Sequence, residues 1–190
     1  MAFAAFLLMA SPFILLSRLE EMAAHGESVF YCLANFFALF PGKVGSYLRS
    51  AFYYGALKRC DWETYIGFGT FFSHRSAEVG KNVAIGAYCI IGSASIGDNV
   101  MIASRVSILS GKHQHIDDSG QLVRSPIFEK ISIGEDSWVG EGAILMDDVG
   151  EKSIISAGAV VTRKAAPNSK LMGKPARNFS DIGKAGLETK

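Results

Sequence analysis

Two histidines stand close together in a polar stretch of the chain. His113 and His115 are two of only four histidines, and they lie in the segment LSGKHQHIDDSGQLVRSPIFEK, residues 109–130. A neutral imidazole accepts a proton near neutral pH, so either residue could act as a general base toward a hydroxyl group. Segments that interrupt a regular scaffold are also common places for function. We therefore expect the chemistry of this protein in this loop.

Other polar side chains could assist these histidines. Asp117 or Asp118 could orient an imidazole across a turn, and simple solvation at the surface is the alternative for each. Gln114 and Arg124 are candidates for binding an acceptor, and the charge of Arg124 suits a sugar or a phosphate. His74, outside the loop, is a further candidate for an acceptor contact.

Basic residues are concentrated in a second segment, near the C-terminus. The whole chain is balanced at 19 basic against 18 acidic residues, which gives no support for nucleic acid as a partner. Between residues 152 and 180, however, there is no Asp or Glu, and the six charged residues are all basic: Lys152, Arg163, Lys164, Lys170, Lys174 and Arg177. Such a cluster could bind the phosphates of an anionic ligand, and a basic end facing an anionic membrane is the alternative.

The elements that must position these residues follow a six-residue rhythm. Twelve aliphatic residues recur at this spacing in two runs, with one shortened step in each run, and glycine follows seven of them. They are Val79, Ile85, Ile91, Ile96, Ile102, Ile108, Ile133, Val139, Leu145, Val149, Ile155 and Val161. Neither a helix nor an alternating strand has this period, whereas a hexad is one short strand and one corner of a parallel β-solenoid.

This period predicts a three-sided prism with the aliphatic residues inside. Twelve hexads make about four coils, and residues 61–78 are expected to add a less regular one. The glycines are expected at corners that require a positive φ. An ordinary β-sandwich is the alternative, but it would not need a six-residue register.

Residues 1–60 differ in kind from the rest. Residues 1–17 carry no charge and would form a helix about 26 Å long, short for a hydrocarbon core of about 30 Å, with Pro12 expected to kink or break it. Aromatic-rich segments follow at 29–41 and 44–57. We expect short helices that associate with a membrane surface through residues 1–57. The alternatives are a helical cap on the second region or on another subunit, and a single span by residues 1–17.

The three cysteines indicate neither a disulfide framework nor a zinc site. Cys32, Cys60 and Cys89 are odd in number, far apart and without a CxxC pair. We expect them to be packing residues in a reducing compartment.

Several motifs resemble a known family. The hexads IGDNVM and IGEDSWVGEGAI, followed by SAGAVVTRK and GKPA, are similar to the hexapeptide-repeat acyltransferases, in particular galactoside, maltose and exopolysaccharide O-acetyltransferases. The similarity covers residues 61–180 and leaves 181–190 as a tail. It implies an all-β fold, a left-handed parallel β-helix, here with an N-terminal hydrophobic α-helical region. It also implies a homotrimer with active sites between neighbouring prisms, acetyl-CoA or another acyl-CoA as donor, and no metal.

The resemblance also assigns residues to the donor. It implies contacts to coenzyme A from Trp138, Ala157, Gly158, Thr162, Arg163, Lys164, Lys174 and Arg177. Glu141 departs from the pattern, because sugar acetyltransferases often carry a small residue there. The loop motif selects His113 as the base in one register and His115 in a register shifted by two, and both remain open.

Together these features predict an O-acyltransferase. We expect it to acylate a sugar hydroxyl in polysaccharide or lipid-linked glycan biosynthesis, at the cytoplasmic face of the plasma membrane; N-acylation of an amino sugar would use the same base and donor. One alternative is a non-catalytic β-helix scaffold or binding module. The other is a metal enzyme like the β-helical carbonic anhydrases, but the third histidine that such a zinc site needs is not evident.

Overall fold

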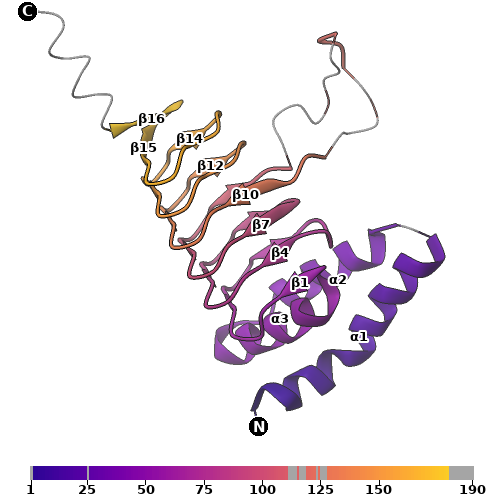
Figure 1. The fold of residues 1–190 in the computed structure, drawn as a ribbon. Helices are drawn as coiled ribbons and strands as arrows, with labels where there is room; N and C mark the ends of the chain where they lie inside the picture. Colours follow the sequence, from indigo (N-terminus) through magenta and orange to yellow (C-terminus); the bar gives the residue numbers. More distant parts are fainter. Residues whose placement is uncertain are drawn as a thin grey trace, which may run out of the picture.

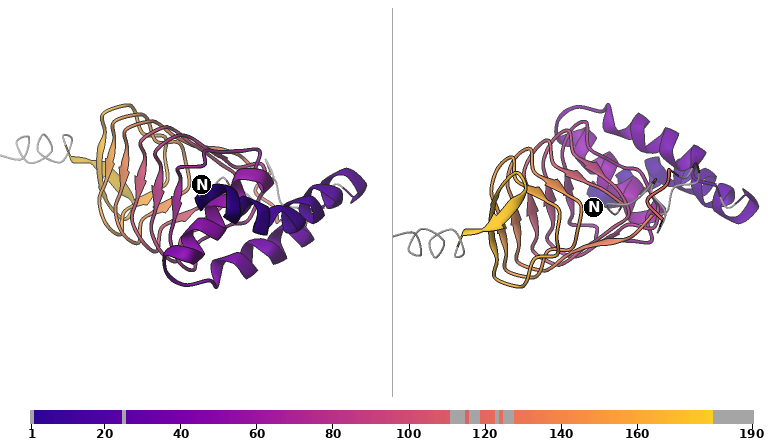
Figure 2. Two further views of the ribbon diagram at one scale, coloured as in Figure 1. Left: turned by 90° about the horizontal axis from the view of Figure 1, so that it is seen from below. Right: turned by 90° about the horizontal axis from the view of Figure 1, so that it is seen from above.

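The computed structural model consists of a helical region followed by a tapering prism of short strands (Figure 1). It describes residues 2–24, 26–110, 115, 119–122, 124 and 128–179. Figure 2 shows the helices gathered at the end of the prism where the strands begin, with the last strands at the opposite end.

The helical region contains α1 (Ala2–Ala24), α2 (Ser28–Ala38) and α3 (Gly42–Ala56). The expected break at Pro12 is wrong, because α1 continues through it. Proline has no N–H to donate to the carbonyl four residues earlier, which here belongs to Leu8. The Ser11 hydroxyl donates to that Leu8 carbonyl instead, at 2.8 Å, and replaces the missing partner.

The prism has three sides, each a sheet of parallel strands contributed by successive coils. Sheet A is β1 (Arg59–Cys60), β4 (Glu78–Val79), β7 (Ala94–Ile96) and β10 (Ile131–Ile133). Sheet B is β2 (Tyr65–Ile66), β5 (Ala84–Ile85), β8 (Met101–Ile102), β11 (Trp138–Val139), β13 (Ile154–Ile155), β15 (Lys170–Gly173) and β16 (Ala176–Asn178). Sheet C is β3 (Phe71–Phe72), β6 (Ile90–Ile91), β9 (Ser107–Ile108), β12 (Ile144–Leu145) and β14 (Val160–Val161). Among the strands of the described residues, only β16 runs antiparallel to its neighbour.

The predicted inward residues are confirmed. All twelve aliphatic positions of the hexads are buried, with at most 3% of their surface exposed. Cys60, Ile66 and Phe72 fill the same positions in the first coil, which therefore begins before residue 61 and gives about five turns in all. Cys60 is thus a packing residue, and its burial raises the pKa of its thiol to about 12.

The glycines of the hexads serve a different purpose from the one expected. A Cβ on Gly134 would lie 2.2 Å from the backbone nitrogen of Glu151 in the next coil, so glycine is needed for close approach between coils. Positive φ angles occur two residues after this glycine position, and Asn82, Tyr88 and Arg105 adopt them there. The corner itself therefore does not require glycine.

The irregular steps of the rhythm all fall at one corner. We name the corners by the sheets they join, so the chain crosses from sheet C to sheet A at the C–A corner. Between successive inward residues the steps at this corner are seven, five, twenty-five, four and four residues, whereas every step at the A–B and B–C corners is six. The loop at 109–130 is the longest of these irregular steps. One corner of the prism therefore carries all the variation.

Two buried arginines join the helical region to the first coil. Arg49, 1% exposed, donates to the carbonyls of Phe37, Phe40 and Ile66. Arg75 bonds to the Ser17 carbonyl and forms a buried ion pair of 2.7 Å with Glu20. The helices α2 and α3 thus cover the open end of the prism, as the alternative of a helical cap predicted.

The outer side of α1 is left uncovered. Its exposed large apolar residues are Leu8, Met9, Leu15, Leu16, Leu19 and Met22. The segment Phe3–Ala23 is long and apolar enough to cross a membrane, and its most apolar window is only 11% buried. Such a helix is weak evidence by itself, since a signal sequence has the same properties.

Candidate active site

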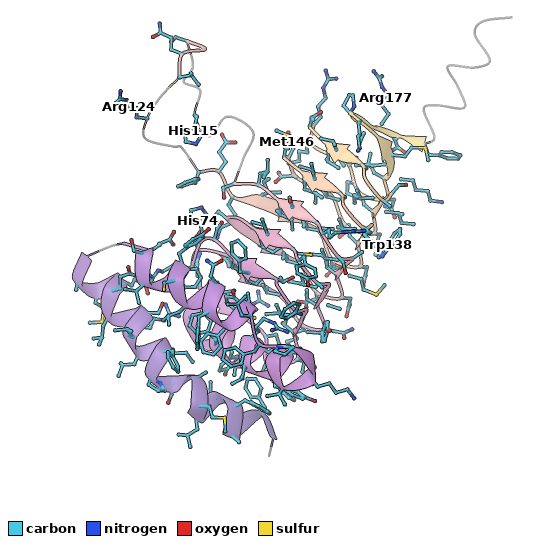
Figure 3. All side chains as sticks on the ribbon, turned by 180° about the vertical axis from the view of Figure 1, so that it is seen from behind. His74, His115, Arg124, Trp138, Met146 and Arg177 are labelled. Atoms are coloured by element: carbon cyan, nitrogen blue, oxygen red, sulfur yellow. The ribbon has the colours of Figure 1, made fainter. Side chains whose placement is uncertain are left out.

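The loop that carries the candidate bases leaves the prism at the C–A corner and returns to it. His113 and Gln114 lie outside the described residues, while His115 and Arg124 are exposed. Figure 3 places His115 above His74 on one edge of the prism, with Arg124 farther out. The returning chain is closed against the departing one, since the Glu129 amide donates to the Ser110 carbonyl at 3.0 Å.

The returning end of the loop is fixed to the first two coils. The ring of Phe128 lies 4.3 Å from the His74 ring, centroid to centroid. Lys130 bonds to Glu78 at 2.7 Å, and Lys58 bonds to the same carboxylate oxygen at 2.8 Å. These two ammonium groups lower the pKa of Glu78 to about 2.

A carboxylate not identified from the sequence holds His74. Glu27, directly before α2, lies with its Oε2 2.6 Å from Nδ1 of His74. Its other oxygen accepts the backbone N–H of Arg75 at 3.0 Å. Burial opposes ionisation of Glu27, but these hydrogen bonds outweigh it and lower the pKa of this carboxyl group. Only its position before an apolar helix marks Glu27 in the sequence, and that signal does not point to His74.

The C–A corner brings several predicted residues to one side of the molecule. His74 follows β3, the loop follows β9, and Thr162, Arg163 and Lys164 follow β14. Lys164 forms an ion pair of 3.3 Å with Asp148, which follows β12 at the same corner. Met146, also after β12, lies along this edge in Figure 3, whereas Trp138 lies on another side.

The remaining donor residues form a second group around sheet B and the B–C corner. Trp138 is exposed on β11 and pairs in register with Met101 and Ile154 of the neighbouring coils. Gly158 has a φ of +67°, and a Cβ added to it would lie 3.8 Å from Cε of Lys174, which the β15–β16 turn returns to this corner. The structure thus brings Gly158 and Lys174 together beside the exposed Ala157.

Glu141 is paired at the same corner. Its carboxylate bonds to Arg105 of the preceding coil at 2.5 Å, and its carbonyl accepts the Gly158 amide at 2.8 Å. The acidic residue that departs from the family pattern therefore lies beside the Ala157–Gly158 backbone with its charge balanced.

The six basic residues do not form one patch within a chain. Lys152 lies at the A–B corner, Arg163 and Lys164 at the C–A corner, and Lys174 at the B–C corner, with Lys170 and Arg177 on β15 and β16. Because one side and one corner take only six residues, positions close in sequence fall on different sides. All six are exposed.

Comparison with known proteins agrees with this architecture. A family model described as the hexapeptide repeat of succinyl-transferase matches residues 77–109 and 130–163. The galactoside O-acetyltransferase of Escherichia coli K12 is 33% identical over 95 residues, which are 47% of this chain and 45% of that protein. The chain is thus similar to hexapeptide-repeat acetyltransferases over the regular part of the prism. It spans about half the length of the curated relatives that it matches first.

Solved structures of hexapeptide-repeat and maltose acetyltransferases share the fold. A maltose O-acetyltransferase from Clostridium difficile 630 superposes with a TM-score of 0.71 at 23% identity, over 80% of this chain and 84% of that one. A hexapeptide-repeat acetyltransferase from Vibrio cholerae, complexed with acetyl coenzyme A, has a TM-score of 0.67 at 18% identity, over 84% and 90%. At such identities the likeness shows the fold alone, the left-handed parallel β-helix that the resemblance implied.

A metal centre finds no support in the described part of the chain. Among those residues, no three His, Cys, Asp or Glu side chains gather as a metal site requires.

Proposed function

We propose that this protein is an acyl-CoA-dependent O-acyltransferase that transfers an acetyl group to a sugar hydroxyl in polysaccharide or lipid-linked glycan biosynthesis. The observation that carries the proposal is the loop at the C–A corner. A histidine-bearing insertion leaves an otherwise regular β-helix at the corner where Thr162, Arg163 and Lys164 also lie. Relatives with this β-helix bear the names of sugar O-acetyltransferases.

In this proposal, one loop imidazole acts as the general base. His113 or His115 takes the proton of the acceptor hydroxyl, whose oxygen forms a bond to the acyl carbonyl carbon. The carbon–sulfur bond of the thioester breaks, and the imidazolium returns the proton to the departing thiolate. The acyl donor supplies only its activated thioester carbonyl. A backbone N–H of a neighbouring coil would stabilise the oxyanion, which is a role that the exposed corners suit.

The site would be completed between two copies of the chain. The loop group at the C–A corner and the group formed by Trp138, Gly158 and Lys174 lie on different sides of one prism. Exposed apolar residues line two outer faces: Tyr65, Met101, Trp138 and Ile154 on sheet B, and Ile90 and Ile144 on sheet C. Sheet A is polar outside, with Arg59, Glu78 and Ser132. This asymmetry supports a homotrimer that buries sheets B and C.

The residues present suit coenzyme A. At the B–C corner the exposed backbone of Ala157 and Gly158 carries no bulky side chain, and Lys174 lies beside it. An extended pantetheine arm could follow such a backbone, while Arg163, Lys164 and Arg177 could bind its phosphates from the same or a neighbouring copy.

The exposed side of α1 supports binding to a membrane surface. Because α2 and α3 pack against the inner side of α1, lipid cannot surround the helix as it would surround an isolated span. We therefore propose that α1 lies in the interface at the cytoplasmic face, where its apolar residues enter the lipid and the acceptor is lipid-linked.

Mass spectrometry of cell-surface polysaccharide and lipid-linked sugars tests the reaction directly. Cells that produce the wild-type chain should carry acetyl groups that are missing from cells without it and from cells with His113→Ala and His115→Ala together. Full acetylation in the double variant would contradict the mechanism. Failure of the purified protein to bind acetyl-CoA in a thermal-shift titration would favour a scaffold.

Flotation with liposomes tests the membrane. Leu8→Glu with Leu15→Glu should abolish flotation with anionic liposomes, because both side chains are exposed on α1. Ser132→Glu with Ala166→Glu adds the same charge at exposed positions on the prism and should leave flotation unchanged. Equal flotation of both double variants would contradict the role of α1.

A further inference from the structure

The junction between α2 and the first coil contains a histidine–carboxylate pair that the proposed reaction does not use. Nδ1 of His74 lies 2.6 Å from Glu27 Oε2. Because the second oxygen of Glu27 already accepts the Arg75 amide, the carboxylate cannot rotate away without losing both bonds. An ionised carboxylate only accepts hydrogen bonds, so neutral His74 must carry its proton on Nδ1. Its Nε2 is then an acceptor.

This pair borders a hollow. A shallow hollow of about 350 Å³, open to solvent, is lined by Glu27, Ser28, Tyr31, Ser73 and His74. Among the described residues, no hydrogen bond occupies Nε2 of His74. The ring of Phe128 packs against the same imidazole, so the returning end of the loop that carries the candidate bases contacts a residue that lines the hollow.

The pair is not the deepest polar contact between the helices and the prism. Arg49 and the ion pair between Arg75 and Glu20 are more deeply buried, with side chains no more than 9% exposed. The side chains of His74 and Glu27 are 17% and 33% exposed, so they face the hollow from its edge.

The lining has the chemistry of a sugar site. Such sites combine aromatic surface with a few fixed polar groups, and here Tyr31 supplies a ring while Ser28, Ser73 and Glu27 supply oxygens. We propose that this hollow binds the sugar acceptor, that His74 Nε2 accepts a hydrogen bond from one of its hydroxyls, and that Glu27 is the positioning residue that fixes the tautomer. This inference rests on the proposed function and adds to it the place of the acceptor.

Two substitutions of His74 separate a binding role from a structural one. The amide of Asn in His74→Asn reaches about as far as Nδ1, so this variant can still donate to Glu27 but has nothing at the place of Nε2. The amide of Gln in His74→Gln reaches about as far as Nε2 but loses the bond to Glu27. Ser50→Ala is the control, because Ser50 joins α3 to the first coil through the Thr64 carbonyl, away from the hollow.

The experiment uses the full chain with acetyl-CoA. The acceptor probe is alkali-deacetylated surface glycan and lipid-linked sugar from cells lacking the protein. His74→Asn should keep the wild-type melting temperature and acetyl-CoA affinity while its KM for the probe rises at least about tenfold. His74→Gln should melt lower and keep more acceptor affinity than His74→Asn. Ser50→Ala should melt lower with an unchanged KM.

The two possible failures are distinguishable. If the wild-type chain acetylates nothing in this probe, the proposed function falls and the inference falls with it. If the wild-type chain is active and His74→Asn has a wild-type KM, only the inference is overturned, and the pair is structural.

Discussion

The helical region and the prism both bury apolar side chains, but they do so under different constraints. In the prism every coil presses its backbone onto the next, so the fold demands a residue type at each sixth position and glycine at the close approaches. In the helical region, rings such as Phe30, Phe37 and Phe52 stack on one another, and a Cβ on Gly55 would first meet the side chain of Ile14. The comparison shows that a six-residue sequence period specifies the prism, whereas a high content of aromatic and aliphatic residues specifies the helical region.

The two regions also differ in what they leave outside. The prism exposes apolar side chains on flat sheet faces, which suit copies of the same shape. The helix α1 exposes Leu8, Leu15 and Met22 along its outer side, which suits a fluid phase. The buried arginines Arg49 and Arg75 make several polar contacts between the two regions, and substitution of Arg49 should have the largest effect.

Arg49→Met would break the joint between the regions. It removes the cation that serves the carbonyls of Phe37, Phe40 and Ile66, so three buried acceptors lose a partner. At about 1–2 kcal/mol for each carbonyl, the free energy of unfolding should fall by about 3–6 kcal/mol. Urea denaturation followed by circular dichroism measures this. A loss below about 1 kcal/mol would show that the helices fold independently of that joint.

Substitution of two glycines tests whether close backbone packing constrains the prism more strongly than side-chain packing constrains the helices. Gly134→Ala sets a Cβ against the backbone of Glu151 and should lower the free energy of unfolding by about 3 kcal/mol, since the next coil cannot move aside. Gly55→Ala in α3 meets only the Ile14 side chain, at 2.7 Å, and gains helix propensity, so its effect should stay within about 1 kcal/mol. Equal losses in thermal or urea unfolding would refute the distinction between the regions.

The Arg105–Glu141 pair tests the B–C corner as a donor site. Arg105→Ala leaves an unpaired carboxylate beside the Ala157–Gly158 backbone and should weaken coenzyme A binding about two- to fivefold. Glu141→Ala should strengthen binding by a similar factor, and high salt should reduce both effects. Isothermal titration calorimetry at two salt concentrations provides the measurement. Unchanged affinity in both variants would exclude this corner from the site.

Glu78 should give the smallest effect, and a pH-dependent one. Its pKa falls from an ordinary 4.5 to about 2 through Lys130 and Lys58, so its contribution to stability is present above about pH 4.5 and is lost as pH falls toward 2. At pH 7 the free energy of unfolding of the wild type should exceed that of Glu78→Gln by less than about 1 kcal/mol, because the ion pair between Glu78 and Lys130 is partly exposed. The two melting temperatures should converge toward pH 2. A constant difference across this range would contradict the ion pair.

Much of the fold was open to prediction because the prism interior is narrow. Each coil admits one side chain at each side, so the sequence must repeat every six residues, and the repeat locates strands, interior and the interrupting loop. Cys60, Ile66 and Phe72 carry the same spacing and would have extended the predicted prism to its first coil. The spacing also locates the C–A corner in the sequence, because the steps between inward residues depart from six at this corner.

The sequence by itself determined which residues are buried in the prism, at which corner the hexads are interrupted, and that apolar helices precede the prism. The tertiary structure alone decided which surface residues meet. It separated the six basic residues onto several corners, returned Lys174 to Gly158 and brought Glu27 to His74 across forty-seven positions. Burial inside the prism requires an apolar residue at about every sixth position, so this constraint is visible in the sequence. Contacts between corners and between regions depend on how coils and helices are placed in space, and no local spacing encodes them.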